Sequence, residues 1–290
     1  MNVAHSPDEL ERVPRAAAIG TFDGVHLGHR SVVRTAVEAG ARPAVVTFDP
    51  HPREVLGNQV QLLASLERRL ELLAALGVED TLVVEFTPEV AQLEPEEFAR
   101  RYLEPLGVRL VAAGESFRFG RGRAGDLALL RELGFETAVA PLVAGASSTE
   151  IRRRLDAGDV AGAASLLGRP PEVEGTVVAG DARGGTLGFP TANLRVDQAL
   201  LVPRFGIYAG AALGHRAAVS IGVNPHYGGL ERRVEAHLLD FGGDLYGRRI
   251  VLELWQRLRD EAVFGSEEEL VAQIARDVEA ARAADRPGEA

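Results

Sequence analysis

The hydrophobic pattern of this chain changes at Gly168-Arg169-Pro170-Pro171, and no other feature constrains its fold as much. Before this point short apolar runs alternate with helical patterns, whereas after it apolar and polar residues alternate at every second position. The first pattern indicates a parallel sheet with helical crossovers, and the second indicates antiparallel strands. Because domains average about 150 residues, the 290 residues predict two domains, residues 1–168 and residues 169–290, joined at the paired prolines.

The first domain is predicted to be α/β. Its apolar runs indicate buried strands at Ala16–Ile19, Ala44–Phe48, Thr81–Val84, Arg109–Ala112 and Thr137–Ala140. Helical patterns lie between these strands, at Ser31–Ala39, Leu66–Leu76 and Pro95–Leu103. We therefore expect a Rossmann-like parallel sheet, which binds its ligands beyond the carboxyl ends of the strands.

The second domain is predicted to be a small antiparallel β-barrel. Its alternating runs lie at Glu174–Ala179, Gly206–Ala211, Arg216–Ile221, Val234–Leu239 and Ile250–Leu254. Glycine, proline and asparagine separate these short strands, as is typical of small barrels. An amphipathic helix, Ser266–Ala283, closes the chain, with Ser266 as its expected cap.

Composition excludes several kinds of chemistry. The chain has no cysteine, and all 32 of its basic residues are arginine. Thiolate nucleophiles and cysteine-held metals are excluded, as are Walker-type and Schiff-base lysines. A net charge of −10, with neither half basic, argues against nucleic acid as a partner. Without a long apolar run, a signal sequence or an obvious coiled coil, we expect a cytoplasmic protein that does not bind membranes and is a monomer or weak homo-oligomer.

The turn after the first predicted strand, Gly20–His29, is the strongest candidate site. Its glycines allow close approach of a ligand, and the helix that follows offers unpaired N–H groups to phosphate. His26 and His29 stand one turn apart and could stabilise charge on an α-phosphate. Two surface histidines after a tight turn are the alternative. The residues expected to bind ATP here are Gly20, Phe22, Asp23, Gly24, His26, Gly28 and His29.

Three further segments follow predicted strands of the same sheet. Ser147, Ser148, Thr149 and Arg152 could hold phosphates, although hydroxyls at a helix start often serve only as caps. Asp49, Pro50 and His51 form a rigid loop at the carboxyl edge of the sheet, where contact with the ligand is expected. Phe117 and Phe119 could contact the same ligand or simply pack their own loop.

In the second domain, polar residues are expected along two extended segments. Thr191 and Asn193 follow Gly188-Phe189-Pro190 and project to one side, where their oxygens suit Mg²⁺ beside a nucleotide. Glu235 is expected on the opposite face of its strand from Val234 and Ala236. It could act as a base for a substrate hydroxyl, or could be a solvated strand residue. Gly180 and Arg183 belong to a glycine-rich loop that could cover phosphates.

In this order the segments resemble the prokaryotic bifunctional riboflavin kinase/FMN adenylyltransferase family, the FAD synthetases, from about Arg15 to Arg282. Phe22–His29 is similar to the nucleotidyltransferase His-x-Gly-His motif, and Ser147–Arg152 to the second phosphate motif of that superfamily. Residues 188–193 resemble the riboflavin kinase motif. Val234–Phe241, with Asp244-Leu245-Tyr246-Gly247, resembles the kinase segment that carries the catalytic glutamate.

The resemblance implies two activities. The C-terminal domain would phosphorylate riboflavin with ATP to give FMN, and the N-terminal nucleotidyltransferase domain would adenylylate FMN to give FAD and pyrophosphate. It also implies that Glu235 is the kinase base and that Thr191 and Asn193 form the Mg²⁺–nucleotide site. The flavin contacts of the adenylyltransferase site are then Asp49, Pro50, His51, Phe117 and Phe119. The sequence departs from the family pattern at Ser116, Ala146, Val223 and His226.

Two other functions remain open. One is a different nucleotidyltransferase joined to an unrelated barrel, which the motif at 188–193 argues against. The other is a non-catalytic flavin-binding protein, which the intact residues at the proposed sites argue against.

Overall fold

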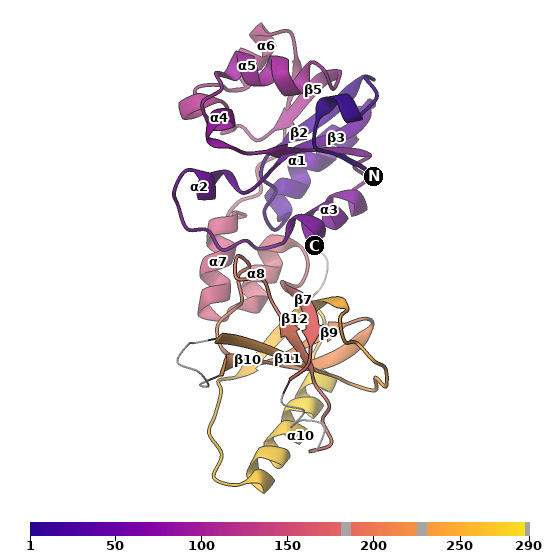
Figure 1. Ribbon diagram of the computed structural model, residues 1–290, viewed down its shortest axis with the longest axis vertical. Helices are drawn as coiled ribbons and strands as arrows, with labels where there is room; N and C mark the ends of the chain where they lie inside the picture. The colour runs from indigo at the N-terminus through magenta and orange to yellow at the C-terminus, as the bar shows by residue number, and fades with distance from the viewer. Residues whose placement is uncertain (181–186, 225–230, 288–290) are drawn as a thin grey trace. The chain divides into compact units, whose positions relative to one another are not determined.

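The computed structural model describes residues 1–180, 187–224 and 231–287. Arg183 and His226 therefore lie outside the described residues. The chain forms two compact units (Figure 1). One comprises Met1–Val60 and Ser65–Ala146, and the other comprises Gln61–Ala64 and Ser147–Ala290.

The first unit contains a parallel sheet with the strand order β1-β4-β3-β2-β5-β6. The strands are β1 (Asn2–Ala4), β2 (Arg15–Ile19), β3 (Arg42–Asp49), β4 (Asp80–Glu85), β5 (Val108–Ala113) and β6 (Glu136–Val139). The predicted Rossmann-like sheet is confirmed, because fully buried parallel strands give continuous apolar runs. The sequence analysis missed only the short β1 among the described strands of this sheet.

Helices cover both faces of this sheet (Figure 1). Alternate residues of β2 face opposite layers. Ala16 and Ala18 share an apolar cluster with α1 (Leu27–Val37) and α3 (Leu66–Ala75), whereas Ala17 and Ile19 share one with α4 (Pro88–Ala91), α5 (Pro95–Phe98), η2 (Ala99–Leu103) and α6 (Leu127–Glu132). The other helical segments of this unit are η1 (Pro7–Glu9), α2 (Pro52–Val55) and η3 (Arg121–Arg123). The carboxyl ends of the strands of this sheet lead into the loops that contain the predicted site residues.

A buried ionic cluster joins four strands at the amino edge of the sheet. Asp80 accepts hydrogen bonds from Arg15 Nε at 2.8 Å, Arg42 Nε at 2.6 Å and Asn2 Nδ2 at 2.8 Å. Burial alone would raise the pKa of Asp80, but the hydrogen bonds from Arg42, Asn2 and Arg15 outweigh it and lower the pKa to about 2. The cluster lies at the end of the sheet opposite to the ligand edge.

The second unit contains a closed barrel with the strand order β10-β11-β8-β7-β12-β9, and neighbouring strands are antiparallel. The strands are β7 (Glu172–Val178), β8 (Ala192–Arg195), β9 (Gly206–Ala212), β10 (His215–Asn224), β11 (Glu231–Leu238) and β12 (Arg249–Arg259). Helix α10 (Glu267–Ala283) packs beside β9 and β10, and Ser266 Oγ caps it by accepting from Glu269 N–H. The predicted barrel, helix and cap are confirmed.

Two further helices, α7 (Ser148–Ala157) and α8 (Val160–Leu167), pack with the barrel. Ile151 and Leu155 of α7 and Leu167 of α8 belong to the same apolar cluster as the barrel interior. For this reason the compact units divide between Ala146 and Ser147, before the paired prolines. The functional boundary at residue 168 stays a prediction.

Candidate active sites

The turn after β2 has an unusual backbone conformation, with positive φ angles at two residues other than glycine. Phe22 and Val25 have φ values of 51° and 40°, in a region that bulky side chains rarely adopt. Two groups hold the turn by bonding to Thr21 O: Thr47 Oγ1 at 3.2 Å and the Arg69 guanidinium at 2.7 Å. Such strain concentrates where a binding loop must keep one geometry.

His26 and His29 lie together at the start of α1. His26 is the N-cap, and its Nδ1 accepts from His29 N–H at 3.3 Å. The two rings stack with centroids 3.6 Å apart. Because Nδ1 accepts, a neutral His26 carries its proton on Nε2, which is thereby a donor.

Gly28 allows this stacking. A Cβ at position 28 would lie 3.1 Å from His26 Cε1 and 3.5 Å from Ala146 O. The missing side chain therefore makes room for the His26 ring. Ala146, in the same unit, lies close to this position.

The surroundings of His29 favour its neutral form. Burial, the neighbouring His26 and the cation of Arg69 lower the pKa of His29 well below 6.5. Its Nδ1 is buried and has no hydrogen-bond partner among the described residues. An anionic ligand would relieve both the local positive field and the unpaired nitrogen.

Arg69 is a residue of this site that the sequence analysis missed. It lies on α3, is only 4% exposed, and bonds to Thr21 O and to Phe48 O at 3.2 Å. It also forms an ion pair with Asp49 at 3.4 Å. Arg69 thus joins the turn after β2 to the end of β3.

The other predicted residues of this edge differ in role. Asp49 lies beside Arg69, and His51 caps α2 by accepting from Arg53 N–H at 3.1 Å. Phe119 is buried in the core and packs on Phe98, whereas Phe117 is only partly buried. Phe117 also packs against this core and stacks on Phe119, so both rings support their own loop. Contact of either ring with a flavin stays a prediction.

The second phosphate motif belongs to the second unit. Ser147 caps α7 by accepting from Glu150 N–H at 3.2 Å, and Arg152 Nε donates to Gln61 O at 2.6 Å. Capping is therefore observed. A phosphate-binding role for Ser147, Ser148, Thr149 and Arg152 stays a prediction.

In the barrel, strand pairing brings two of the predicted kinase residues, Asn193 and Glu235, side by side. Glu235 is opposite Asn193 of β8 on one side and opposite Ser220 of β10 on the other. Val234 and Ala236 are buried in the core, so Glu235 projects outward, as predicted. Side chains in such a row are about 5 Å apart, close enough to act on one ligand.

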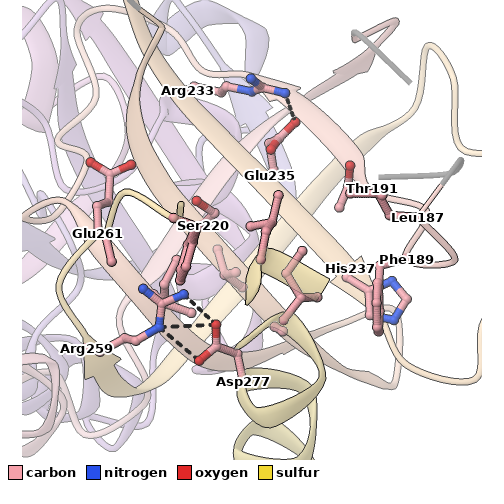
Figure 2. A pocket seen from close by; sticks show the side chains of 17 residues that line it. Leu187, Phe189, Thr191, Ser220, Arg233, Glu235, His237, Arg259, Glu261 and Asp277 are labelled. Atoms are coloured by element: carbon pink, nitrogen blue, oxygen red, sulfur yellow. Dashed lines mark hydrogen bonds and ion pairs between the residues drawn. The ribbon is translucent and has the colours of Figure 1, made fainter. Parts of the chain in front are cut away.

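Glu235 lines a cavity of about 300 Å³ with Thr191, Ser220 and His237 (Figure 2). Its far wall includes Arg259 of β12, which is paired with Asp277 of α10 at 2.6 Å. The cavity therefore has a carboxylate and hydroxyls on the barrel side and an ion pair where the helix packs. Ser220, Arg259 and Asp277 were missed because their sequence neighbourhoods carry no motif.

His237 fixes the segment that precedes Thr191. Its Nδ1 is 2.8 Å from Pro190 O, and its ring packs edge-on against Phe189. The motif residues are thereby attached to the strand that carries Glu235.

Gly180 lies directly against Asn193. A Cβ at position 180 would be 2.4 Å from the amide of Asn193, so only glycine allows this approach. Gly180 and Asn193 line a second, larger cavity of about 1100 Å³, to which Arg195, Arg232 and Arg233 contribute. A polar cavity with three arginines suits an anionic ligand.

The fold and these sites define a nucleotidyltransferase-like α/β unit joined to a riboflavin kinase-like barrel. The family model for FAD synthetase matches residues 9–152, and that for riboflavin kinase matches residues 167–284. The chain is 38% identical to the bifunctional riboflavin kinase/FMN adenylyltransferase of Listeria monocytogenes, covering 95% of this chain and 94% of the relative. It is 39% identical to the enzyme of that name in Escherichia coli K12, covering 91% and 90% of the two chains.

A crystal structure described as a macrolide-efflux protein from Streptococcus pneumoniae is also similar, with a TM-score of 0.87 and 30% identity. It covers 97% of this chain and 98% of its own. The chain belongs to the bifunctional riboflavin kinase/FMN adenylyltransferase family, as the sequence resemblance predicted. It is therefore an enzyme of two activities.

Within the described part of the chain, no helix is both long and apolar enough to cross a bilayer.

Proposed function

We propose that the barrel phosphorylates riboflavin to FMN, that the α/β unit adenylylates FMN to FAD, and that the residues at the two sites act as follows. The observation that carries the kinase assignment is the row Asn193–Glu235–Ser220, with Thr191 in the same cavity as Glu235. Family membership supplies the two reactions, and the geometry supports the roles of individual side chains.

In the kinase step, Glu235 takes the proton of the terminal hydroxyl of riboflavin. The oxygen then attacks the γ-phosphorus of ATP, and the bond to the β-phosphate oxygen breaks to release ADP. Ser220, opposite Glu235, is placed to orient that hydroxyl. The 300 Å³ cavity holds the flavin end of the reaction.

Thr191 and Asn193 fit the requirements of Mg²⁺ bound to a nucleotide. Mg²⁺ prefers hard oxygen ligands and takes only one or two from the protein when phosphates supply the rest. The hydroxyl of Thr191 and the amide oxygen of Asn193 are such ligands, and Gly180 packs against the amide. When bound, Mg²⁺ neutralises charge on the phosphates.

In the adenylyl step, a phosphate oxygen of FMN attacks the α-phosphorus of ATP, and pyrophosphate leaves. His26 and His29 stabilise charge at the α-phosphate from the start of α1. Ser147, Ser148, Thr149 and Arg152, in the second phosphate motif, are the proposed contacts of the other phosphates. The proposed flavin contacts are Asp49, Pro50, His51, Phe117 and Phe119.

One assay tests both activities. The protein is incubated with ATP, Mg²⁺ and riboflavin, and the flavins are separated by chromatography. FMN and FAD are expected. Tight flavin binding without either product would favour the non-catalytic alternative, and nucleotidyl transfer to another phosphate without FMN would favour the different nucleotidyltransferase.

We also propose that the protein is cytoplasmic, that it is a monomer or weak homo-oligomer, and that it has no nucleic-acid partner. Cell fractionation, sedimentation velocity and a gel-shift titration test them respectively.

A further inference from the structure

The proposed kinase base is already paired with a cation. Arg233 donates a hydrogen bond from its guanidinium to Glu235 Oε1 (Figure 2). The two residues are two positions apart on β11, so both side chains leave the barrel on the same side. The Arg233 side chain is 35% exposed and that of Glu235 is 18% exposed.

The ion pair itself does not join two elements, because both partners belong to one strand. Partly exposed pairs of this kind contribute little to stability. The pair does bear on the chemistry, because the lone pair of Glu235 Oε1 that accepts from the guanidinium is one that cannot accept the proton of a substrate hydroxyl. Transfer of Arg233 to another partner would make that lone pair available to the substrate.

Arg233 also lies beside a second cavity. It lines both the 300 Å³ cavity of Glu235 and the 1100 Å³ cavity of Asn193 and Gly180. Arg195 and Arg232 make the larger cavity positively charged, which suits the phosphates of a nucleotide. A guanidinium on a long, flexible side chain binds phosphate as well as carboxylate.

We propose that Arg233 is a positioning residue that releases the base when the nucleotide binds. Without nucleotide it pairs with Glu235, and with nucleotide it turns to the phosphate oxygens and leaves Glu235 free to accept the hydroxyl proton. This proposal rests on the proposed function of Glu235 as the base. It predicts a competition between Glu235 and phosphate for one guanidinium.

The test measures the kinase reaction of the full chain as the sum of FMN and FAD formed from riboflavin. Conversion of FMN to FAD then does not change the measured kinase rate. For Arg233→Gln we expect the KM for ATP and the inhibition constant of ADP to rise about tenfold or more, the value of one charge-assisted hydrogen bond. The KM for riboflavin should change little. Arg233→Lys should restore part of the loss, because lysine keeps the charge.

The decisive measurement uses Glu235→Gln, whose residual activity still reports inhibition by ADP. Without the competing carboxylate, ADP should inhibit about two- to fivefold more tightly, as expected for release from an exposed ion pair. This gain should vanish in the Arg233→Gln background. It should persist in the matched Arg232→Gln background, because Arg232 lines the same larger cavity from the next position along the strand.

An unchanged inhibition constant in Glu235→Gln, or an equal gain in the Arg233→Gln background, would overturn the competition and leave Glu235 as the base. Parental kinase turnover in Glu235→Gln would instead overturn the base assignment, and this proposal with it. A parental KM for ATP in Arg233→Gln would also overturn it.

Discussion

His29 is a better residue than His26 for testing the adenylyltransferase site. His26 caps α1 through its bond to His29 N–H, so its removal would also cost about 1 kcal/mol of helix stability. The ring of His29 forms no such backbone bond among the described residues.

We expect His29→Ala to lower FAD formation by about 10²-fold, which is typical of losing one group that stabilises the transition state. FMN formation should be unchanged, because the kinase residues lie in the other unit. Steady-state assays of each reaction, with exposed His5 changed to alanine as the control, test this. Equal damage to both reactions would contradict the assignment of two sites.

Glu235→Gln preserves size and hydrogen bonding but removes the proposed base. FMN formation should fall by about 10²–10⁴-fold, the usual contribution of a positioned base. Riboflavin binding should change little, and FAD formation from supplied FMN should persist. Exposed Glu267→Gln is the matched control. Near-normal kinase turnover would show that Glu235 is a solvated strand residue.

The candidate residues that belong to motifs were predicted from the sequence, whereas the residues that contact them or hold their loops were not. Arg69 could not be found, because a charged residue in an amphipathic helix normally faces solvent. It is buried only because two strand-end loops offer it carbonyl oxygens. Ser220 was missed because its importance comes from strand register, which local sequence does not encode.

Among the elements, the strands of the sheet were predictable because burial on both faces makes each a continuous apolar run. β1 was not, because only Ala4 of its three residues is buried. It is held partly by Asn2, which bonds to Asp80.

The cluster around Asp80 should make the first unit sensitive to acid. A carboxyl with a pKa of about 2 in the folded chain and 3.8 as its ordinary value stabilises the fold fully above about pH 4. About 2 kcal/mol of that stability is lost as the pH falls toward 2. In Asp80→Asn this part of the pH dependence should disappear, which urea unfolding from pH 5 to 2, followed by circular dichroism, would detect.

At pH 7 the same variant should lose about 3–5 kcal/mol, because buried Arg15 is left without its counter-charge. The neighbouring, exposed Glu79→Gln is the control and should lose little. Trp255, the single tryptophan, lies in the second unit and reports that unit separately by fluorescence. An unshifted dichroism midpoint in Asp80→Asn would contradict the role of the cluster.

For the whole molecule, the sequence predicted the two architectures but not which of them α7 and α8 pack against. Their apolar faces fit either a sheet or a barrel, and only the folded contacts with the barrel core decide the matter. The change of periodicity at the paired prolines marks where strands begin, which is a different point from where the compact unit begins.

Two fragments should therefore differ in stability. A fragment of residues 147–290 should fold and make FMN. A fragment of residues 171–290 should be several kcal/mol less stable, because it loses buried side chains such as Ile151, Leu155 and Leu167. Thermal unfolding and kinase assays of both fragments test this. Equal stability, with full activity in the shorter one, would support a boundary at residue 168.

The alternation along β11 also bears on how this enzyme can change over evolutionary time. Substitutions can alter Arg233, Glu235 or His237 without touching the core, because the alternate positions Val234, Ala236 and Leu238 are the ones buried in it. Insertion or deletion of a single codon within the strand would exchange the two sets and bury the charged residues. Length variation among descendants of this gene should therefore be confined to the ends of β11, while its interior diversifies by replacement only.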